Sequence, residues 1–312
     1  MWKNFPRQSE LDRDRFALDM ARPLPEREYV MYFTPRSGSS WITDIVWQTR
    51  RLSLPGEVFN PNFLPNIIQS YNASSMDEYC DVLRRRRNTR GVFGFQITYH
   101  QLAAVFDRES DFLARFPSPI CFWLIRRDIV LQAISLYKMV QTQAGHAAQT
   151  PLDEIARRDQ GVAYDGAAIR HWLQHILNAE IKTEDMFARH GLKPMRMSYE
   201  RNVEMHPNHV VQVMGQHIGV PKMRLKPLES AHSKIATATN DSFADRFRSQ
   251  YAGFLQEVDA QRSPMLGQLE YYGPRIGPRV GPHVGPRVGP RVGPSLGVGQ
   301  GVSGQDTQGY GG

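Results

Sequence analysis

Cysteine and long apolar runs are both scarce in this chain of 312 residues. Its two cysteines, Cys80 and Cys121, have a spacing that matches neither a zinc site nor a disulfide framework. No window approaches the roughly 20 consecutive apolar residues that a membrane-spanning helix needs. The first residues, MWKNFPRQSELDRDRF, are charged and lack the apolar segment of a secretory signal. The sequence therefore predicts a cytoplasmic protein.

Metal-binding motifs are also missing. His171 and His175 are spaced to share one face of a helix, but no glutamate fills the position that HExxH requires. No third ligand is evident either, and we interpret the two histidines as a pair on a helix face. The sequence predicts no metal ion.

The excess of positive charge is modest in the body of the chain, because part of it lies in the C-terminal segment. The net charge is +7, and residues 273–312 hold four of the arginines but only one acidic residue, Asp306. The remaining body is weakly basic, which suits an anionic ligand without requiring nucleic acid. Basic and aromatic residues are not interleaved as in single-strand binders, so we expect no nucleic-acid partner.

The C-terminal segment differs from the rest of the chain. From Gly273 it repeats GPRV-like units of four residues, in which proline excludes a helix and glycine offers nothing to pack. The period of four also excludes collagen. We predict a disordered tail over 266–312, a catalytic domain over 25–265 and an N-terminal extension over 1–24. The tail either contacts a membrane surface or another anionic partner, or is a repeat without function, which we favour.

The body alternates between strand and helix patterns. Apolar stretches rich in strand formers lie at 28–34, 91–98, 119–125 and 194–199. Helical patterns follow the first strand and recur at 128–142, 165–187 and 206–219. This order predicts an α/β fold with a central, mostly parallel sheet flanked by helices. Ligands of such folds bind at the carboxyl ends of the strands.

The loop TPRSGSSW, residues 34–41, joins the first strand to a helix expected to begin near Ser39. Free amides and the dipole at such a helix start attract phosphate or sulfate. The loop adds a cation, hydroxyl donors and a glycine that permits close approach, supplied by Arg36, Ser37, Gly38, Ser39 and Ser40. It lacks the Gly-Lys-Ser/Thr of nucleoside-triphosphate loops and the G-x-G-x-x-G of dinucleotide loops. A simpler interpretation is an ordinary helix capped by serine.

A second stretch, IRRDIVLQAISLYK (125–138), again passes from a buried strand into a helix. Arg126 lies at the strand end, and Ser135 follows nine residues later, about two and a half helical turns. Two such sites at one sheet edge could bind both ends of one ligand. Alternatively, Arg126 pairs with Asp128, and Ser135 bonds to its own helix backbone.

These two stretches resemble the 5′-phosphosulfate loop and the 3′-phosphate motif of sulfotransferases that use 3′-phosphoadenosine 5′-phosphosulfate (PAPS). The chain is most similar to the bacterial Stf0-type carbohydrate sulfotransferases, which include trehalose and lipopolysaccharide sulfotransferases. The similarity extends through GVFGFQITYHQL and RHGLKPMRMSYE and covers about residues 28–255. It implies a P-loop-like sulfotransferase fold, PAPS as donor, a carbohydrate or glycolipid acceptor, and a homodimer.

The resemblance also implies roles for individual residues. The donor would bind to Arg36, Ser37, Gly38, Ser39, Ser40, Trp41, Arg126, Ser135 and Lys234, the last from a late loop. Glu57 would be the general base, with Arg36 as the electrophilic catalytic residue and His100 as an alternative base. Gln96 departs from the family, whose strand often carries a lysine there, so a positive charge is missing on the acceptor side.

Sulfuryl transfer to an alcohol needs a base for the hydroxyl proton and fixed donors for the charge on the leaving phosphate. The sequence thus predicts a PAPS-dependent carbohydrate sulfotransferase. One alternative is a P-loop-like kinase or phosphotransferase that uses the same anion loop. Another is a non-enzymatic module in which the tail and the basic run Arg84–Arg87 bind an anionic polymer or membrane. That run could equally be the last turn of a helix.

Overall fold

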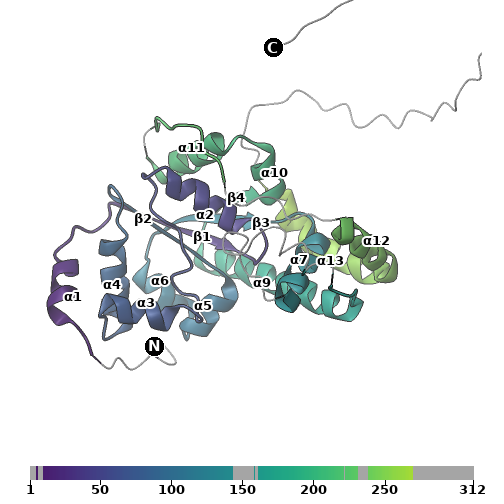
Figure 1. Cartoon of the computed structure of the whole chain (residues 1–312), viewed down its shortest axis with the longest axis horizontal. Helices are drawn as coiled ribbons and strands as arrows, with labels where there is room; N and C mark the ends of the chain where they lie inside the picture. The colour runs from purple at the N-terminus through teal and green to yellow at the C-terminus, as the bar shows by residue number, and fades with distance from the viewer. Residues whose placement is uncertain are drawn as a thin grey trace, which may run out of the picture. The chain divides into compact units, whose positions relative to one another are not determined.

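The computed structural model of the protein describes residues 5, 10–142, 158, 161–220, 222–230 and 238–269. At its centre lies a four-stranded sheet in the order β2-β1-β3-β4, in which every neighbouring pair is parallel (Figure 1). The strands are β1 (Arg27–Phe33), β2 (Val92–Ile97), β3 (Ile120–Ile125) and β4 (Met195–Ser198). The predicted α/β fold with a parallel sheet is confirmed.

The sheet is buried on both faces because its strands are almost continuously apolar. Side chains of β1 alternate between two hydrophobic clusters: Val30 and Tyr32 belong to one, Tyr29 and Met31 to the other. In the register, Tyr32 lies opposite Ile97 of β2 and opposite Trp123 of β3. This register brings the carboxyl ends of these three strands to the same edge.

Three helices cover the face that carries Tyr29 and Met31. In Figure 1, α2 and α11 lie above the sheet, with α10 beside them. Their bounds are α2 (Ser39–Gln48), α10 (Tyr199–Glu204) and α11 (Pro207–Ile218). Ile42, Ile45 and Val46 of α2 are fully buried here, which confirms the apolar face predicted for the helix after the first strand.

The opposite face is covered by shorter helices and by part of α9. These are α1 (Arg13–Met20), α3 (Leu64–Tyr71), α4 (Met76–Arg86), α5 (Tyr99–Val105), α6 (Glu109–Arg115) and α9 (Gly166–His190). Phe59 stands at the centre of this cluster, with edge-on aromatic neighbours such as Phe95 and Tyr79 at 5.2 and 5.9 Å between ring centroids.

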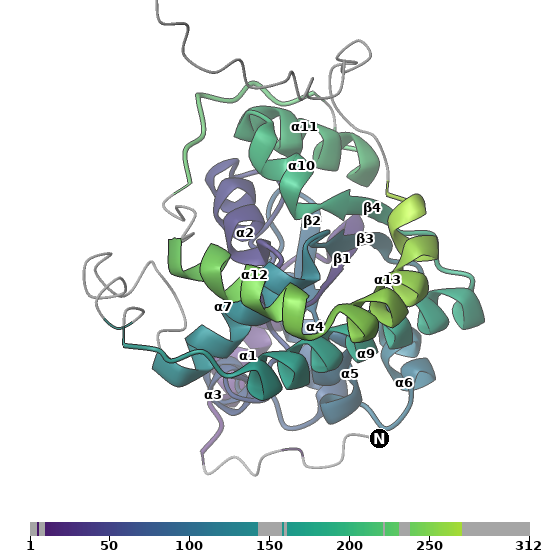
Figure 2. The same cartoon turned by 90° about the vertical axis from the view of Figure 1, so that its right-hand side faces the viewer.

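Figure 2 shows the backbone of the helices that a third hydrophobic cluster joins to α9. The cluster contains α7 (Ile129–Thr142), α12 (Ala238–Gln250) and α13 (Ala252–Gly267). The helices predicted at 128–142, 165–187 and 206–219 are therefore confirmed as α7, α9 and α11. Helix α9 extends to His190, where Gly191 takes a left-handed conformation (φ 63°) that ends it.

The arginine run Arg84–Arg87 forms the end of α4, and each side chain contacts a neighbour. Arg84 pairs with Glu28 at 2.8 Å, and Arg86 donates to the Ser70 carbonyl at 2.8 Å. Arg85 donates to a carbonyl of the N-terminal segment, and Arg87 to a tyrosine hydroxyl. The helix-end interpretation of this run therefore holds.

Two predictions fall outside the part of the chain that the structure describes: Lys234 and the GPRV repeat itself. Helix α13 continues to Gly267, two residues into the predicted tail. Among the described residues, none of the helices is both long and apolar enough to span a bilayer.

Candidate functional site

The predicted anion loop and the second strand-end motif lie side by side, because β1 and β3 are neighbours. Arg36, in the loop after β1, donates from Nε to Ser135 Oγ of α7 at 2.9 Å. Arg126, directly after β3, donates from Nη1 to the Arg36 carbonyl at 3.3 Å. The structure thus brings together three of the predicted donor-binding residues.

Arg36 and Arg126 form a cationic pair. Burial, and secondly the charge of Arg126, lower the pKa of Arg36. Within the described chain neither side chain pairs with a carboxylate. Asp128, the partner of Arg126 in the alternative interpretation, instead binds Arg248 at 2.8 Å. Two adjacent cations without a counter-ion among the described residues favour the binding of an anion between or beside them.

The helix that follows the loop is not capped by a serine. Helix α2 begins at Ser39, and its N-cap is Gly38 with φ 88°, which has no side chain to cap the first amides. The simpler interpretation of this loop as a serine-capped helix is therefore wrong. Ser40 and Trp41 follow in the first turn.

In the described part of the chain, the buried polar atoms without a hydrogen-bond partner include Ser37 Oγ and Arg126 Nε. Buried polar groups are almost always paired in native proteins. Both atoms can donate, and both lie on segments that converge on the start of α2. These donors fit a ligand with phosphate or sulfate oxygens.

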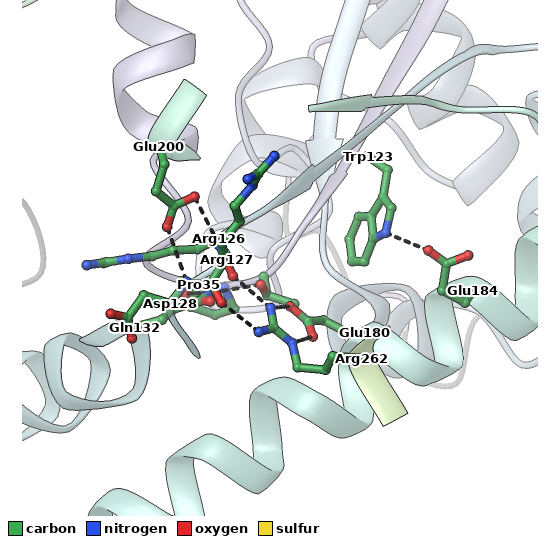
Figure 3. Close-up of polar contacts among 11 residues, drawn as sticks. Pro35, Trp123, Arg126, Arg127, Asp128, Gln132, Glu180, Glu184, Glu200 and Arg262 are labelled. Carbon is green, nitrogen blue, oxygen red and sulfur yellow. Dashed lines mark hydrogen bonds and ion pairs between the residues drawn. The ribbon is translucent and has the colours of Figure 1, made fainter. Parts of the chain in front are cut away.

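Residues that sequence reasoning overlooked hold the loop in place. Gln132 of α7 donates from Nε2 to Thr34 Oγ1 at 2.9 Å and to the Pro35 carbonyl at 2.7 Å. Figure 3 shows Gln132 and Pro35 close to the Arg126 turn. Gln132 lies three residues before Ser135, so helical spacing is a signal that could have identified it. Tyr199 packs against Gly38, since a Cβ there would come within 2.5 Å of its ring.

Glu57 lies in the loop after α2 and is held by two amides. Its Oε2 accepts from Asn60 Nδ2 at 2.8 Å and from Gln101 Nε2 at 2.6 Å. The Gln101 side chain also completes a capping box at the start of α5, where its Oε1 accepts from the Thr98 amide at 2.9 Å. This second bond fixes the amide so that its NH₂ faces Glu57. The T-x-x-Q spacing could have revealed Gln101.

The Glu57 loop is attached to the same sheet edge through β2. The backbone N–H of Gln96 donates to the Gly56 carbonyl at 3.2 Å. Gln96 itself is buried, and its Oε1 has no hydrogen-bond partner. Because β2 neighbours β1, the candidate base and the anion loop share one edge of the sheet.

His100 faces a different element. Its ring stacks on that of His175 in α9, with centroids 4.1 Å apart, and its Nε2 lies 3.4 Å from the His175 carbonyl oxygen. Burial, followed by the charges of His100 and His171, lowers the pKa of His175 to about 4. In the described residues, no three His, Cys, Asp or Glu side chains are arranged to hold a metal ion.

Comparison with known proteins identifies the family. A family model for Stf0 sulphotransferases matches residues 28–250. The chain belongs to the Stf0 sulphotransferase family. The resemblance inferred from the sequence motifs is confirmed, and the protein is a sulfotransferase.

Two relatives of this Stf0 protein are both named trehalose 2-sulfotransferase. The one from Mycobacterium tuberculosis (strain Erdman) is 23% identical over 267 residues, which cover 72% of this chain and 95% of the relative. The one from Mycolicibacterium smegmatis is 24% identical over 178 residues, which cover 52% of this chain and 62% of the relative. The family match spans the anion loop, Glu57 and the Arg126 motif, and ends before α13.

Proposed function

We propose that this Stf0 enzyme transfers a sulfuryl group from PAPS to a hydroxyl of a carbohydrate or glycolipid. The observation that carries this proposal is the cationic pair of Arg36 and Arg126. Ser135 of α7 accepts a hydrogen bond from Arg36, and the loop that carries Arg36 leads into α2, whose N-cap has no side-chain hydrogen bond. A donor with phosphate groups at both ends would supply anions to both motifs.

In this proposal the donor's two ends are divided between the two strand ends. Loop residues 36–41 and the first amides of α2 bind the 5′-phosphosulfate. Arg126 and Ser135 bind the 3′-phosphate, and Lys234 is a further proposed contact. The buried donors at Ser37 and Arg126 support this division because each gains an acceptor when phosphate oxygens bind.

The chemistry assigned to the chain's own residues is acid–base and electrostatic. Glu57 takes the proton of the acceptor hydroxyl while the hydroxyl oxygen forms its bond to sulfur. The bond between sulfur and the 5′-phosphate oxygen breaks, and the electron pair stays on that oxygen. Arg36 and the loop amides stabilise the resulting charge. His100 is the weaker candidate base, because its described contacts lie on α9.

The acceptor class is proposed from the relatives. Both are named for sulfation of trehalose, so trehalose is the first sugar to test. Gln96, with its unpaired buried Oε1 next to the Glu57 loop, offers an acceptor atom for a sugar hydroxyl at this position.

Thermal unfolding with bound nucleotides tests the donor site. Adenosine 3′,5′-bisphosphate, the expected product, should stabilise the protein by about 2.7 kcal/mol at a hundredfold excess over its Kd. ATP and NAD at the same concentration should stabilise it far less, because neither carries a 3′-phosphate. Stabilisation by ATP alone would refute the proposal in favour of a phosphotransferase.

A further inference from the structure

The turn that carries Arg126 is held from α13, a helix outside the family match. Figure 3 shows the Arg262 guanidinium facing the backbone of this turn. Its Nη2 donates to the Arg126 carbonyl at 2.7 Å, and its Nη1 donates to the Arg127 carbonyl at 2.8 Å. Residues 136 positions apart in the chain are thereby joined.

A buried carboxylate orients Arg262. Glu180 of α9 accepts from Arg262 Nε at 2.7 Å and from Nη2 at 3.0 Å, and both side chains are 1% exposed. Burial raises the pKa of Glu180, while the Arg262 charge opposes this. The flat guanidinium donates four hydrogen bonds here, two to the carboxylate and one to each carbonyl, whereas a lysine ammonium has only three donors. A buried ion pair of this kind adds little net stability, so a role in orientation accounts better for its presence.

The opposite side of the turn is held by α10. The Glu200 carboxylate accepts from the amides of Arg127 at 3.0 Å and of Asp128 at 3.2 Å (Figure 3). Carbonyls and amides of the same turn are thus fixed from two directions. Tyr199, the residue before Glu200, places its ring centroid 4.9 Å from the Arg126 guanidinium carbon. Arg126 is left with little freedom in backbone or side chain.

We propose that Arg262, backed by Glu180, is a positioning residue that holds Arg126 in place for the donor's 3′-phosphate. The inference rests on the proposed function, in which Arg126 binds that phosphate. A displacement of about 1 Å in a binding group can cost up to about a hundredfold in function. Release of the two carbonyls should therefore weaken recognition of the 3′-phosphate more than recognition of the rest of the donor.

The test compares two ligands that differ only in the 3′-phosphate. Isothermal titration of the full chain measures the Kd of adenosine 3′,5′-bisphosphate and of adenosine 5′-monophosphate. We expect Arg262→Lys to weaken the bisphosphate about tenfold and the monophosphate much less. A second variant, Glu200→Gln, loosens the other side of the turn at a partly exposed position, and should shift the same ratio in the same direction.

Helix α9 offers a matched control one turn beyond Glu180. Glu184 accepts from Trp123 Nε1 at 2.9 Å and from Arg196 Nη2 at 2.7 Å, and its described contacts leave the Arg126 turn untouched. Glu184→Gln should lower the midpoint of urea unfolding without changing the ratio of the two Kd values. The same unfolding measurement shows whether the Arg262 and Glu200 variants are folded.

Each other outcome has a distinct meaning. An unchanged ratio in folded Arg262→Lys and Glu200→Gln, or an equal weakening of both ligands, would overturn the positioning role alone. A wild-type protein with no preference for the bisphosphate would overturn the proposed donor site, and the positioning role with it.

Discussion

Glu57 receives hydrogen bonds only from neutral amides in the described structure, those of Asn60 and Gln101. Amide donors orient a carboxylate without cancelling its charge, whereas an arginine partner would hold it ionised. The arrangement suits a group that must accept a proton. Gln101 acts here through Glu57 and is itself fixed by the capping box of α5.

Substitution of Glu57 tests the assignment of the base. Glu57→Gln keeps the shape and the neighbouring amides but removes the proton acceptor. We expect sulfuryl transfer to fall by about a hundredfold to ten-thousandfold, with the Kd for adenosine 3′,5′-bisphosphate unchanged. Product formation by mass spectrometry and titration calorimetry measure the two quantities. Full activity in the variant would remove Glu57 from this role.

Among the elements, the junction of β1 and α2 depends on a glycine. Gly38 has φ 88°, and a Cβ at this position would come within 2.5 Å of the Tyr199 ring. Gly38→Ala should therefore cost about 1–2 kcal/mol through the left-handed backbone, and also displace Tyr199 from the loop. We expect weaker binding of adenosine 3′,5′-bisphosphate together with a lower unfolding midpoint.

Gly191 provides the control for this change. It also has a positive φ, 63°, but nothing lies within 4 Å of an added Cβ. Gly191→Ala should lower the unfolding midpoint through backbone strain alone and leave the nucleotide Kd unchanged. If both variants bind the nucleotide as the wild type does, the packing of Tyr199 on the loop has no part in binding.

Elements with strong periodicity could be predicted from the sequence, and the contacts between them could not. The apolar strands and the long helices α7, α9 and α11 follow from local patterns. Short helices such as α3 and α6 are stabilised by packing against the rest of the fold rather than by the helix propensity of their own residues. In the site, the loop and Arg126 were evident from local motifs. The capping spacing marks Gln101 itself, but its bond to Glu57 and the bond from Arg262 to the Arg126 carbonyl span 44 and 136 residues of sequence, and no local pattern encodes those contacts.

At the scale of the whole molecule, α9 links two hydrophobic clusters. It also carries His175, whose protonation makes the stability of the fold depend on pH. The pKa of His175 is lowered to about 4, whereas an unperturbed histidine titrates near 6.5. Between these values the unfolded chain binds a proton that the folded chain does not. Stability therefore falls as the pH decreases through this window.

Removal of this histidine should make the fold less sensitive to acid. His175→Phe keeps an aromatic ring for the stack with His100 but cannot be protonated. We expect a smaller loss of unfolding free energy between about pH 7 and about pH 5 than in the wild type. Urea titrations at the two pH values measure this difference. Equal losses in both proteins would show that His175 is not responsible.

The most direct test of the account is a transfer assay with the full chain, PAPS and a panel of sugars that includes trehalose, read by mass spectrometry. The account predicts a sugar that gains one sulfate while an equal amount of adenosine 3′,5′-bisphosphate is released. A sugar that gains phosphate from ATP, with no sulfate transferred from PAPS to any acceptor, would contradict it.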